Sequence, residues 1–464
     1  SVGMKTLLSP SSDTAIARGQ WAFTLAPSGE FNISLQPESE IPHLYNFTDG
    51  SRLIGNGSLF KDAASDTTRY AAATLSSFLH PARIINASGS FTAILDSTKG
   101  ADYIIITHPL FLNTAQKLAT RRQLSGFRTK VVITDEVFNA FSFGSDEAWA
   151  LKRYLQYAYD FYAGVPPSLV TLFGDGTWDP KFILNNQLQD NGAKTIHQSF
   201  VPTFGVPNTD YIFSCVEGSG FVDSASFEMV ITRIPVESVI EGESYLQKIV
   251  EYETAHPAVW NSHFLFISGC DAGVQAATLA DFNKLYVGLP PFSTNQFGGL
   301  GNKPISIDTT FIVRRDFINQ IDITQQSAIQ NAFSQGLGLP YFFGHGAPNI
   351  TDVQFPDVGT LRNVGKYPVF ISVSCRTGAF AEPNFIAMNE SFIRVPEAGA
   401  ILAFGTSGFG DQYYDFNMSA RIFNFLRGDS AIARMPSSGA HKLNFPLIMT
   451  ASKFIESILQ PPLS

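Results

Sequence analysis

The sequence is poor in cysteine, in basic residues and in long apolar runs. Three cysteines among 464 residues are too few for a disulfide framework. The 31 Lys and Arg against 40 Asp and Glu leave a net charge of −9, which argues against nucleic acid as a partner because such a partner requires a basic patch. No run reaches the roughly 18 apolar residues that span a membrane, so we expect no transmembrane segment. Residues 1–4 contain no apolar signal core, so we expect any secretion signal to lie outside this sequence.

The composition is that of a globular protein with several domains. Hydrophobic residues make up 44% of the chain, and its 41 Phe residues suit strand-rich packing. At about 150 residues per domain, the length predicts about three domains. Residues 1–98, rich in Ser, Gly, Pro and Asn with short alternating stretches, predict a β-rich N-terminal domain. Residues 99–259 and 260–464 alternate strand and helix patterns, which predicts an α/β fold of parallel sheets flanked by helices in two subdomains.

The strand and helix patterns can be placed along the chain. We expect strands at 21–25, 31–35, 103–107, 129–133, 169–173, 228–234, 264–268, 309–313, 339–343, 369–374 and 400–404. We expect helices at about 113–126, 238–256, 279–287, 324–335 and 413–426. Ser145 is expected to cap a further helix whose first turn carries Asp146 and Glu147, where carboxylates suit the helix dipole.

Two of these strands end on reactive residues. Strand 339–343 leads into Gly344-His345-Gly346, and strand 369–374 leads into Cys375. Both runs are apolar, as buried parallel strands are, and the separation of 30 residues between His345 and Cys375 suffices for one crossover. In open parallel sheets, chemistry gathers where the chain leaves the carboxyl ends of strands. The pattern therefore predicts an imidazole beside a thiol, with His345 taking the proton of Cys375 to give a nucleophilic thiolate.

Each of the two residues alone has a plainer interpretation. A cysteine that ends an apolar run is usually a small buried hydrophobe, and a histidine near glycine is usually a loop residue. Together, at matching strand ends with flanking glycines, they favour a site. Glycines let a substrate backbone approach closely and leave backbone N–H groups to hold an oxyanion.

The motifs GHG at 344–346 and SVSCRTGAF at 372–380 resemble the caspase–gingipain clan, in which one apolar strand precedes His-Gly and another precedes the catalytic Cys. Within that clan the sequence is similar to the gingipain family over about residues 101–425, including NFIAMNESFIRV and GAILAFGTSG after the cysteine. The stretch 101–181 resembles the branch that removes C-terminal signals in type IX secretion. The family usually has glycine where Thr232 stands, and residues after Gly428 lack its closing strand motif, so we expect a truncated or diverged end.

The resemblance implies the roles of several site residues. His345 and Cys375 are implied as the catalytic pair, and the N–H groups of Gly346 and Cys375 as the oxyanion donors. Asp271 aligns with the acid that orients the catalytic histidine, and the alternative is a carboxylate that caps the next helix. Asp281 aligns with the acid that binds a basic substrate side chain, and the alternative is a solvated acid on a helix. Calcium sites occur in gingipains, but no dense carboxylate loop predicts a metal here, and we expect no cofactor.

The resemblance also implies a cysteine endopeptidase that acts on proteins or peptides at the bacterial cell surface, in the periplasm or after secretion. We favour a signal peptidase or transpeptidase of type IX secretion, which cuts secreted proteins bearing a C-terminal signal domain and passes the acyl group to an amine. One alternative is a secreted gingipain-like endopeptidase in which water takes the acyl group. Another is a catalytically inactive surface scaffold, against which the intact pair of His345 and Cys375 argues.

Overall fold

The computed structural model describes residues 5–8, 20–25, 29–35, 43–57, 59–64, 67–77, 93–186, 196–216, 228–256, 258–282 and 308–410. The chain divides into two compact units, Ser1–Ala87 and Ser88–Ser464. The boundaries expected from the sequence at residues 98 and 259 remain predictions.

The described residues of the first unit form two small sheets. One has the strand order β1-β3-β6, and the other is antiparallel with the order β2-β7-β4-β5. Alternate side chains of these strands, among them Ile33, Leu44, Phe60 and Tyr70, form its core. The expected β-rich N-terminal region is therefore present. The elements are β1 (Lys5–Leu8), β2 (Gln20–Leu25), β3 (Gly29–Leu35), β4 (His43–Asn46), β5 (Ser51–Leu53), β6 (Leu59–Ala64), β7 (Thr68–Ala73) and the 3₁₀ turn η1 (Leu75–Ser77).

The second unit begins with a four-stranded sheet, the first parallel sheet, with the order β11-β10-β8-β9. Its central strands are buried on both faces, as expected where helices cover a parallel sheet. The strands are β8 (Tyr103–Thr107), β9 (Thr129–Ile133), β10 (Leu169–Phe173) and β11 (Val230–Ile234). The helices of this part are η2 (Pro109–Phe111), α1 (Leu112–Leu124), α2 (Thr134–Ser142), α3 (Ala148–Phe161), α4 (Ile183–Asn186) and α5 (Tyr211–Ser214).

A five-stranded sheet, the second parallel sheet, follows with the order β13-β12-β14-β17-β18. One face packs with α8 and α9 around Phe342 and Phe370, and the other shares a core with α6 and α7 around Phe266 and Tyr341. The strands are β12 (His263–Ser268), β13 (Asp308–Val313), β14 (Leu339–Phe343), β17 (Val369–Val373) and β18 (Leu402–Gly405), with the small hairpin β15 (Gly346–Ala347) and β16 (Ile350–Thr351). The helices are α6 (Val239–Thr254), η3 (Val259–Ser262), α7 (Ala272–Phe282), α8 (Gln326–Gln335), η6 (Val358–Thr360) and α9 (Met388–Arg394).

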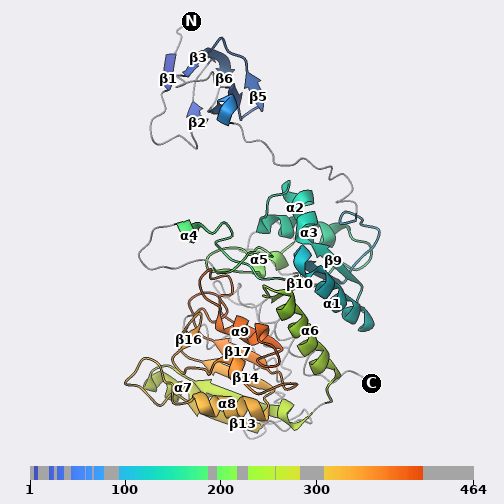
Figure 1. The fold of residues 1–464 in the computed structure, drawn as a ribbon, viewed down its shortest axis with the longest axis vertical. Helices are drawn as coiled ribbons and strands as arrows, with labels where there is room; N and C mark the ends of the chain where they lie inside the picture. Colours follow the sequence, from blue (N-terminus) through green and yellow to red (C-terminus); the bar gives the residue numbers. More distant parts are fainter. Residues whose placement is uncertain are drawn as a thin grey trace, which may run out of the picture. The chain divides into compact units, whose positions relative to one another are not determined.

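Helix α6 lies between the two parallel sheets (Figure 1). Its Tyr245 hydroxyl donates to the Ile401 carbonyl at 2.6 Å, next to β18. Its buried Lys248 donates to the carbonyls at the end of α9, including Ile393 at 2.8 Å and Val395 at 3.0 Å. These bonds satisfy carbonyl groups at the end of α9 that have no partner within that helix. The two parallel sheets therefore share one continuous core through α6.

Two expectations about helices were wrong. Ser145 does not cap α3, because α3 begins at Ala148 and Glu147 occupies the capping position. Ser145 instead closes the turn after α2, and α2 is a helix that the sequence did not predict. The helix expected at 279–287 begins earlier, at Ala272, directly after Asp271. The helix expected at 413–426 and the region after Gly428 lie outside the described residues. Among the helices of the described ranges, none has the length and apolar character needed to cross a bilayer.

Candidate active site

The second parallel sheet brings the loops of His345 and Cys375 to the same edge. Phe343 pairs with Val373 across β14 and β17, and each reactive residue follows its paired residue by two positions. A Cβ atom on Gly346 would lie 2.3 Å from Ser374 Oγ and 3.3 Å from the Cys375 carbonyl oxygen. The two loops are therefore in direct contact, and only glycine fits after the histidine.

The segment that follows β18 holds the loop of Cys375. The Arg376 N–H donates to the Gly408 carbonyl at 2.9 Å, and the Gly378 N–H donates to the Thr406 carbonyl at 2.8 Å. The half-buried Cys375 Sγ accepts the Gly410 N–H at 3.3 Å. Among the described residues, the Cys375 N–H has no hydrogen-bond acceptor. An N–H group of this kind is available to hold an oxyanion.

The His345 ring is exposed to solvent at this edge. Within the part of the chain that the structure describes, no hydrogen bond joins this ring to Cys375 Sγ. Catalytic hydrogen bonds are often long without substrate and tighten in the complex. The structure therefore places the two residues on touching loops but does not link their side chains.

The two acids that the sequence singled out lie at opposite ends of α7. Asp271 is exposed, and its carbonyl accepts the Gln275 N–H at 2.8 Å at the start of the helix. In the described ranges, no hydrogen bond or ion pair links Asp271 to His345. Asp281 lies in the last turn of α7, and its side chain is outside the described part of the structure. Among the described side chains, no contact places Asp271 at the site.

Two residues that the sequence analysis did not assign lie beside His345. The Cys270 sulfur, a carboxylate oxygen of Asp352 and a ring nitrogen of His345 all lie within 4.8 Å of one another. Cys270 follows β12, the strand next to β14, so its position could be inferred from the strand order. Asp352 has no such signal, because a short hairpin rather than a sheet strand brings it back to His345.

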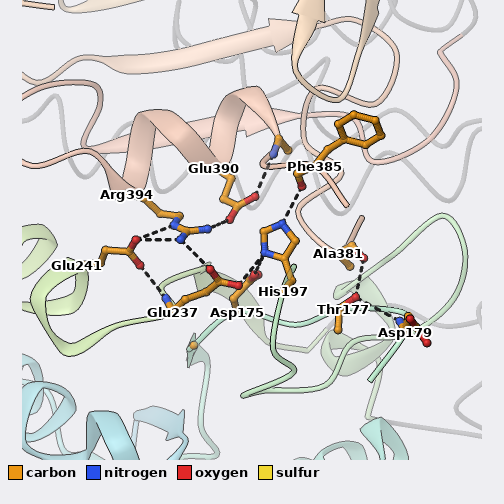
Figure 2. Close-up of polar contacts among 12 residues, drawn as sticks. Asp175, Thr177, Asp179, His197, Glu237, Glu241, Ala381, Phe385, Glu390 and Arg394 are labelled. Atoms are coloured by element: carbon orange, nitrogen blue, oxygen red, sulfur yellow. Dashed lines mark hydrogen bonds and ion pairs between the residues drawn. The ribbon is translucent and has the colours of Figure 1, made fainter. Parts of the chain in front are cut away.

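A second cluster of charges surrounds the fully buried His197 (Figure 2). His197 Nδ1 lies 2.8 Å from Glu237 Oε1 and 3.0 Å from Asp175 Oδ2, and Nε2 lies 2.8 Å from the Phe385 carbonyl oxygen. A carbonyl oxygen can only accept, so Nε2 carries a proton. Because two carboxylates face Nδ1, a second proton is favoured there, and we assign His197 as an imidazolium.

This cluster ties the loop after Cys375 to the first parallel sheet. Phe385 belongs to that loop, and the Thr177 hydroxyl and the Trp178 N–H, which follow β10, both bond to the Ala381 carbonyl in the same loop. On the other side, Arg394 of α9 pairs with acids on and before α6. Its contacts are with Glu237 at 2.8 Å, Glu241 at 2.9 Å and, within α9, Glu390.

Burial and charge shift the pKa values of these groups. Burial acts against protonation of His197, but Asp175 and Glu237 outweigh it and raise its pKa to about 10. Burial, together with the charge of Asp175, raises the pKa of Glu390 to about 8.

Two clusters of described residues could hold a metal ion: Cys270, His345 and Asp352, and Asp175, His197 and Glu237. Calcium takes six to eight oxygen ligands, and both clusters contain nitrogen or sulfur donors. Neither of these two clusters therefore fits calcium.

Replacing His197 with glutamine is expected to lower the free energy of unfolding by about 3 kcal/mol, as when one partner of a buried charge pair is removed. The histidine pKa is raised from 6.5 to about 10 in the folded protein, so its contribution is fully present below pH 6.5 and is lost as pH rises through 10. The stability difference between wild type and His197→Gln, measured by urea unfolding, should therefore shrink across that window. The same substitution at the exposed His256 should show no such trend. A difference that stays constant with pH would contradict the imidazolium.

Comparison with known proteins bears out the fold expected from the sequence. The model of peptidase family C25 matches residues 96–448, more than half of the chain. The crystal structure of the Arg-specific cysteine proteinase gingipain R has a TM-score of 0.54 at 16% identity and covers 79% of this chain and 76% of that chain. The complex of RgpB pro- and mature domains from Porphyromonas gingivalis has a TM-score of 0.51 at 15% identity and covers 77% of this chain and 76% of that chain. At such identities the likeness shows a shared gingipain-like fold and no more.

Two further comparisons carry no argument about function. Dimeric latent PorU from Porphyromonas gingivalis has a TM-score of 0.37 at 23% identity and covers 49% of this chain and 24% of that chain. This TM-score is too low to support a conclusion about fold or role. The comparison with curated proteins finds no match.

Proposed function

Because this chain belongs to peptidase family C25, we propose that it is a cysteine peptidase in which Cys375 is the nucleophile and His345 its base. The main support is the position of these two residues in the second parallel sheet. His345 and Cys375 stand two residues beyond paired positions of neighbouring parallel strands, and Gly346 packs against the loop of Cys375. A base and a thiol on touching loops are the minimum that nucleophilic catalysis by cysteine requires.

The proposed reaction has two steps. His345 takes the proton of Cys375, the thiolate sulfur bonds to the carbon of the scissile carbonyl, and the N–H groups of Gly346 and Cys375 hold the oxyanion. The C–N bond then breaks, and His345 gives its proton to the leaving amine, which leaves an acyl-thioester on Cys375. In the second step, His345 removes a proton from water or from an acceptor amine, which attacks the thioester and frees the thiol.

We further propose that the acceptor is an amine and that the substrates are secreted proteins with a C-terminal signal domain. The support is the resemblance of residues 101–181 to the signal-peptidase branch of type IX secretion. This role places the chain at the bacterial cell surface or in the periplasm. A free digestive peptidase would need a strong side-chain pocket, for which Asp281 is the candidate from the sequence.

Incubation with a protein that ends in a type IX signal domain tests this role. In the presence of glycine amide, intact-mass analysis is expected to show the substrate cut before the signal domain and joined to the amine, and Cys375→Ala is expected to show neither product. Short peptides with a basic residue before the cut should be poor substrates. Rapid cleavage of unrelated denatured proteins after Arg or Lys, with no amine in the products, would support the digestive alternative instead. Asp281→Ala should then abolish that preference.

A further inference from the structure

We propose that Asp352 is the positioning residue that orients His345 and stabilises its charged form. This inference rests on the proposed function, since it assigns the acid that completes the pair of His345 and Cys375. It also moves this role away from Asp271, the acid expected from the sequence. Four features of the described residues carry it: the hairpin register, the space left by two glycines, the burial of the carboxylate and the charges around it.

The hairpin after β14 places Asp352 opposite His345. In β15 and β16, Gly346 pairs with Thr351 in an antiparallel register, so the next positions outward are His345 and Asp352. The Asp352 N–H donates to the His345 carbonyl at 3.0 Å, which continues the ladder by one pair. Side chains directly opposite each other on antiparallel strands lie side by side. Asp352 is thus the cross-strand neighbour of His345 although seven positions separate them in the sequence.

Two glycines leave the space that the Asp352 carboxylate occupies. Gly269 follows β12 and Gly344 follows β14, and a Cβ atom on them would lie 2.1 Å and 2.5 Å from Asp352 Oδ1. Real side chains do not tolerate such distances, so neither position accepts a larger residue without displacing the carboxylate. The carboxyl ends of β12 and β14 therefore leave a space, the carboxylate seat, that is filled by the Asp352 carboxylate.

The carboxylate is held rigidly in that seat. Asp352 is only 5% exposed, and its two oxygens accept the Cys270 N–H at 2.5 Å and the Val353 N–H at 2.9 Å. A carboxylate oxygen has further lone pairs, so both oxygens can still accept from a histidine ring. A His345 ring nitrogen lies within 4.8 Å of a carboxylate oxygen of Asp352, and His345 is exposed to solvent. Asp352 thus presents a fixed charge to a ring that substrate can still reach.

Burial is the largest influence on the Asp352 carboxylate, and nearby N–H groups and charges oppose it. Burial raises the pKa of Asp352 above its ordinary value, although the N–H groups of Cys270 and His345 and the charges of His345 and Arg314 act in the opposite direction. Arg314, which follows β13, lies 3.8 Å from Asp352 Oδ2. Other titratable or charged groups at this edge are the thiols of Cys270 and Cys375, their neighbours Asp271 and Arg376, and Asp322, whose N–H donates to the Asp352 carbonyl at 2.8 Å. A carboxylate in this place stabilises the imidazolium that forms when Cys375 loses its proton.

The pH dependence of Cys375 alkylation by iodoacetamide tests the inference without any substrate. In wild type, the stabilised imidazolium should allow the thiolate to form well below the ordinary thiol pKa of about 8.5. In Asp352→Asn, which keeps the shape of the side chain but not its charge, the midpoint should rise by about one pH unit. The matched variant Asp357→Asn, at an exposed acid five positions away, should keep the wild-type midpoint. With substrate, kcat of Asp352→Asn should fall by about 10²- to 10⁴-fold.

Gly269→Ala provides a second variant that retains the acid. Its added methyl group should push the carboxylate from its seat and raise the same midpoint, so the test does not depend on the folding of Asp352→Asn. A wild-type midpoint near 8.5 would contradict the proposed function itself. A lowered wild-type midpoint that both folded variants leave unchanged would overturn only the role of Asp352. A rise in Asp271→Asn without one in Asp352→Asn would return the role to Asp271.

Discussion

Replacement of Cys375 with alanine is expected to lower kcat by roughly 10⁵- to 10⁶-fold while the protein stays folded. The loss is this large because alanine has no atom on which an acyl-thioester can form. Folding should be retained because Cys375 sits in a half-buried turn and its sulfur contacts the backbone of Gly410 rather than the packed core. The effect is measured as the rate of cleavage of a protein substrate by wild type and variant, after circular dichroism has shown that both are folded alike.

Cys215 offers the matched control for this substitution. Its thiol is fully buried at the end of α5, where it contacts the Ser214 hydroxyl and the Tyr211 carbonyl. Cys215→Ala should therefore lower the unfolding midpoint, through lost packing, and leave kcat close to that of wild type. A folded Cys375→Ala protein that cleaved substrate at the rate of Cys215→Ala would refute the nucleophile.

Replacement of His345 with alanine is expected to lower kcat at neutral pH by roughly 10⁴- to 10⁶-fold. Without the imidazole, no base takes the proton of Cys375, and the leaving amine loses its proton donor. The residual activity should therefore rise with pH as the free thiol ionises. A pH profile of kcat/KM for the variant measures both effects.

The exposed His256 is the control for His345, because both substitutions remove a solvent-facing ring. His256→Ala should keep the wild-type rate and the wild-type pH profile. A His345→Ala protein that retained a large part of wild-type activity at neutral pH would show that another group takes the proton of Cys375.

The strands were predictable because of how they are buried. β8, β10 and β14 have the bounds expected from the sequence, since a strand covered on both faces must be apolar along its whole length and stops where glycine or polar residues begin. Helix starts were harder. Serine is a common helix cap, but the Ser145 N–H bonds within the turn between α2 and α3. The packing of α2, a helix that the sequence does not predict, therefore overrides the capping preference of Ser145.

The candidate site was predictable only where it follows the strands. The strand order alone places Cys270, His345 and Cys375 at one edge, each two residues past a paired position. Asp352 depends on a hairpin of two residues per strand, too short to give an alternating pattern. The contacts of His197 join segments from both parallel sheets, and no local spacing signals a meeting of that kind.

The claim that Cys375 and His345 act as one nucleophilic pair is tested most directly by a labelling experiment on the intact protein. An irreversible thiol-directed peptidyl probe is added, and the modified residue is located by peptide mass spectrometry. We predict rapid labelling of Cys375, no labelling of Cys215 or Cys270 in the same time, and slow labelling of Cys375 in the His345→Ala variant. Labelling of the other cysteines at the rate of Cys375, or a rate at Cys375 that His345→Ala leaves unchanged, would contradict the pair.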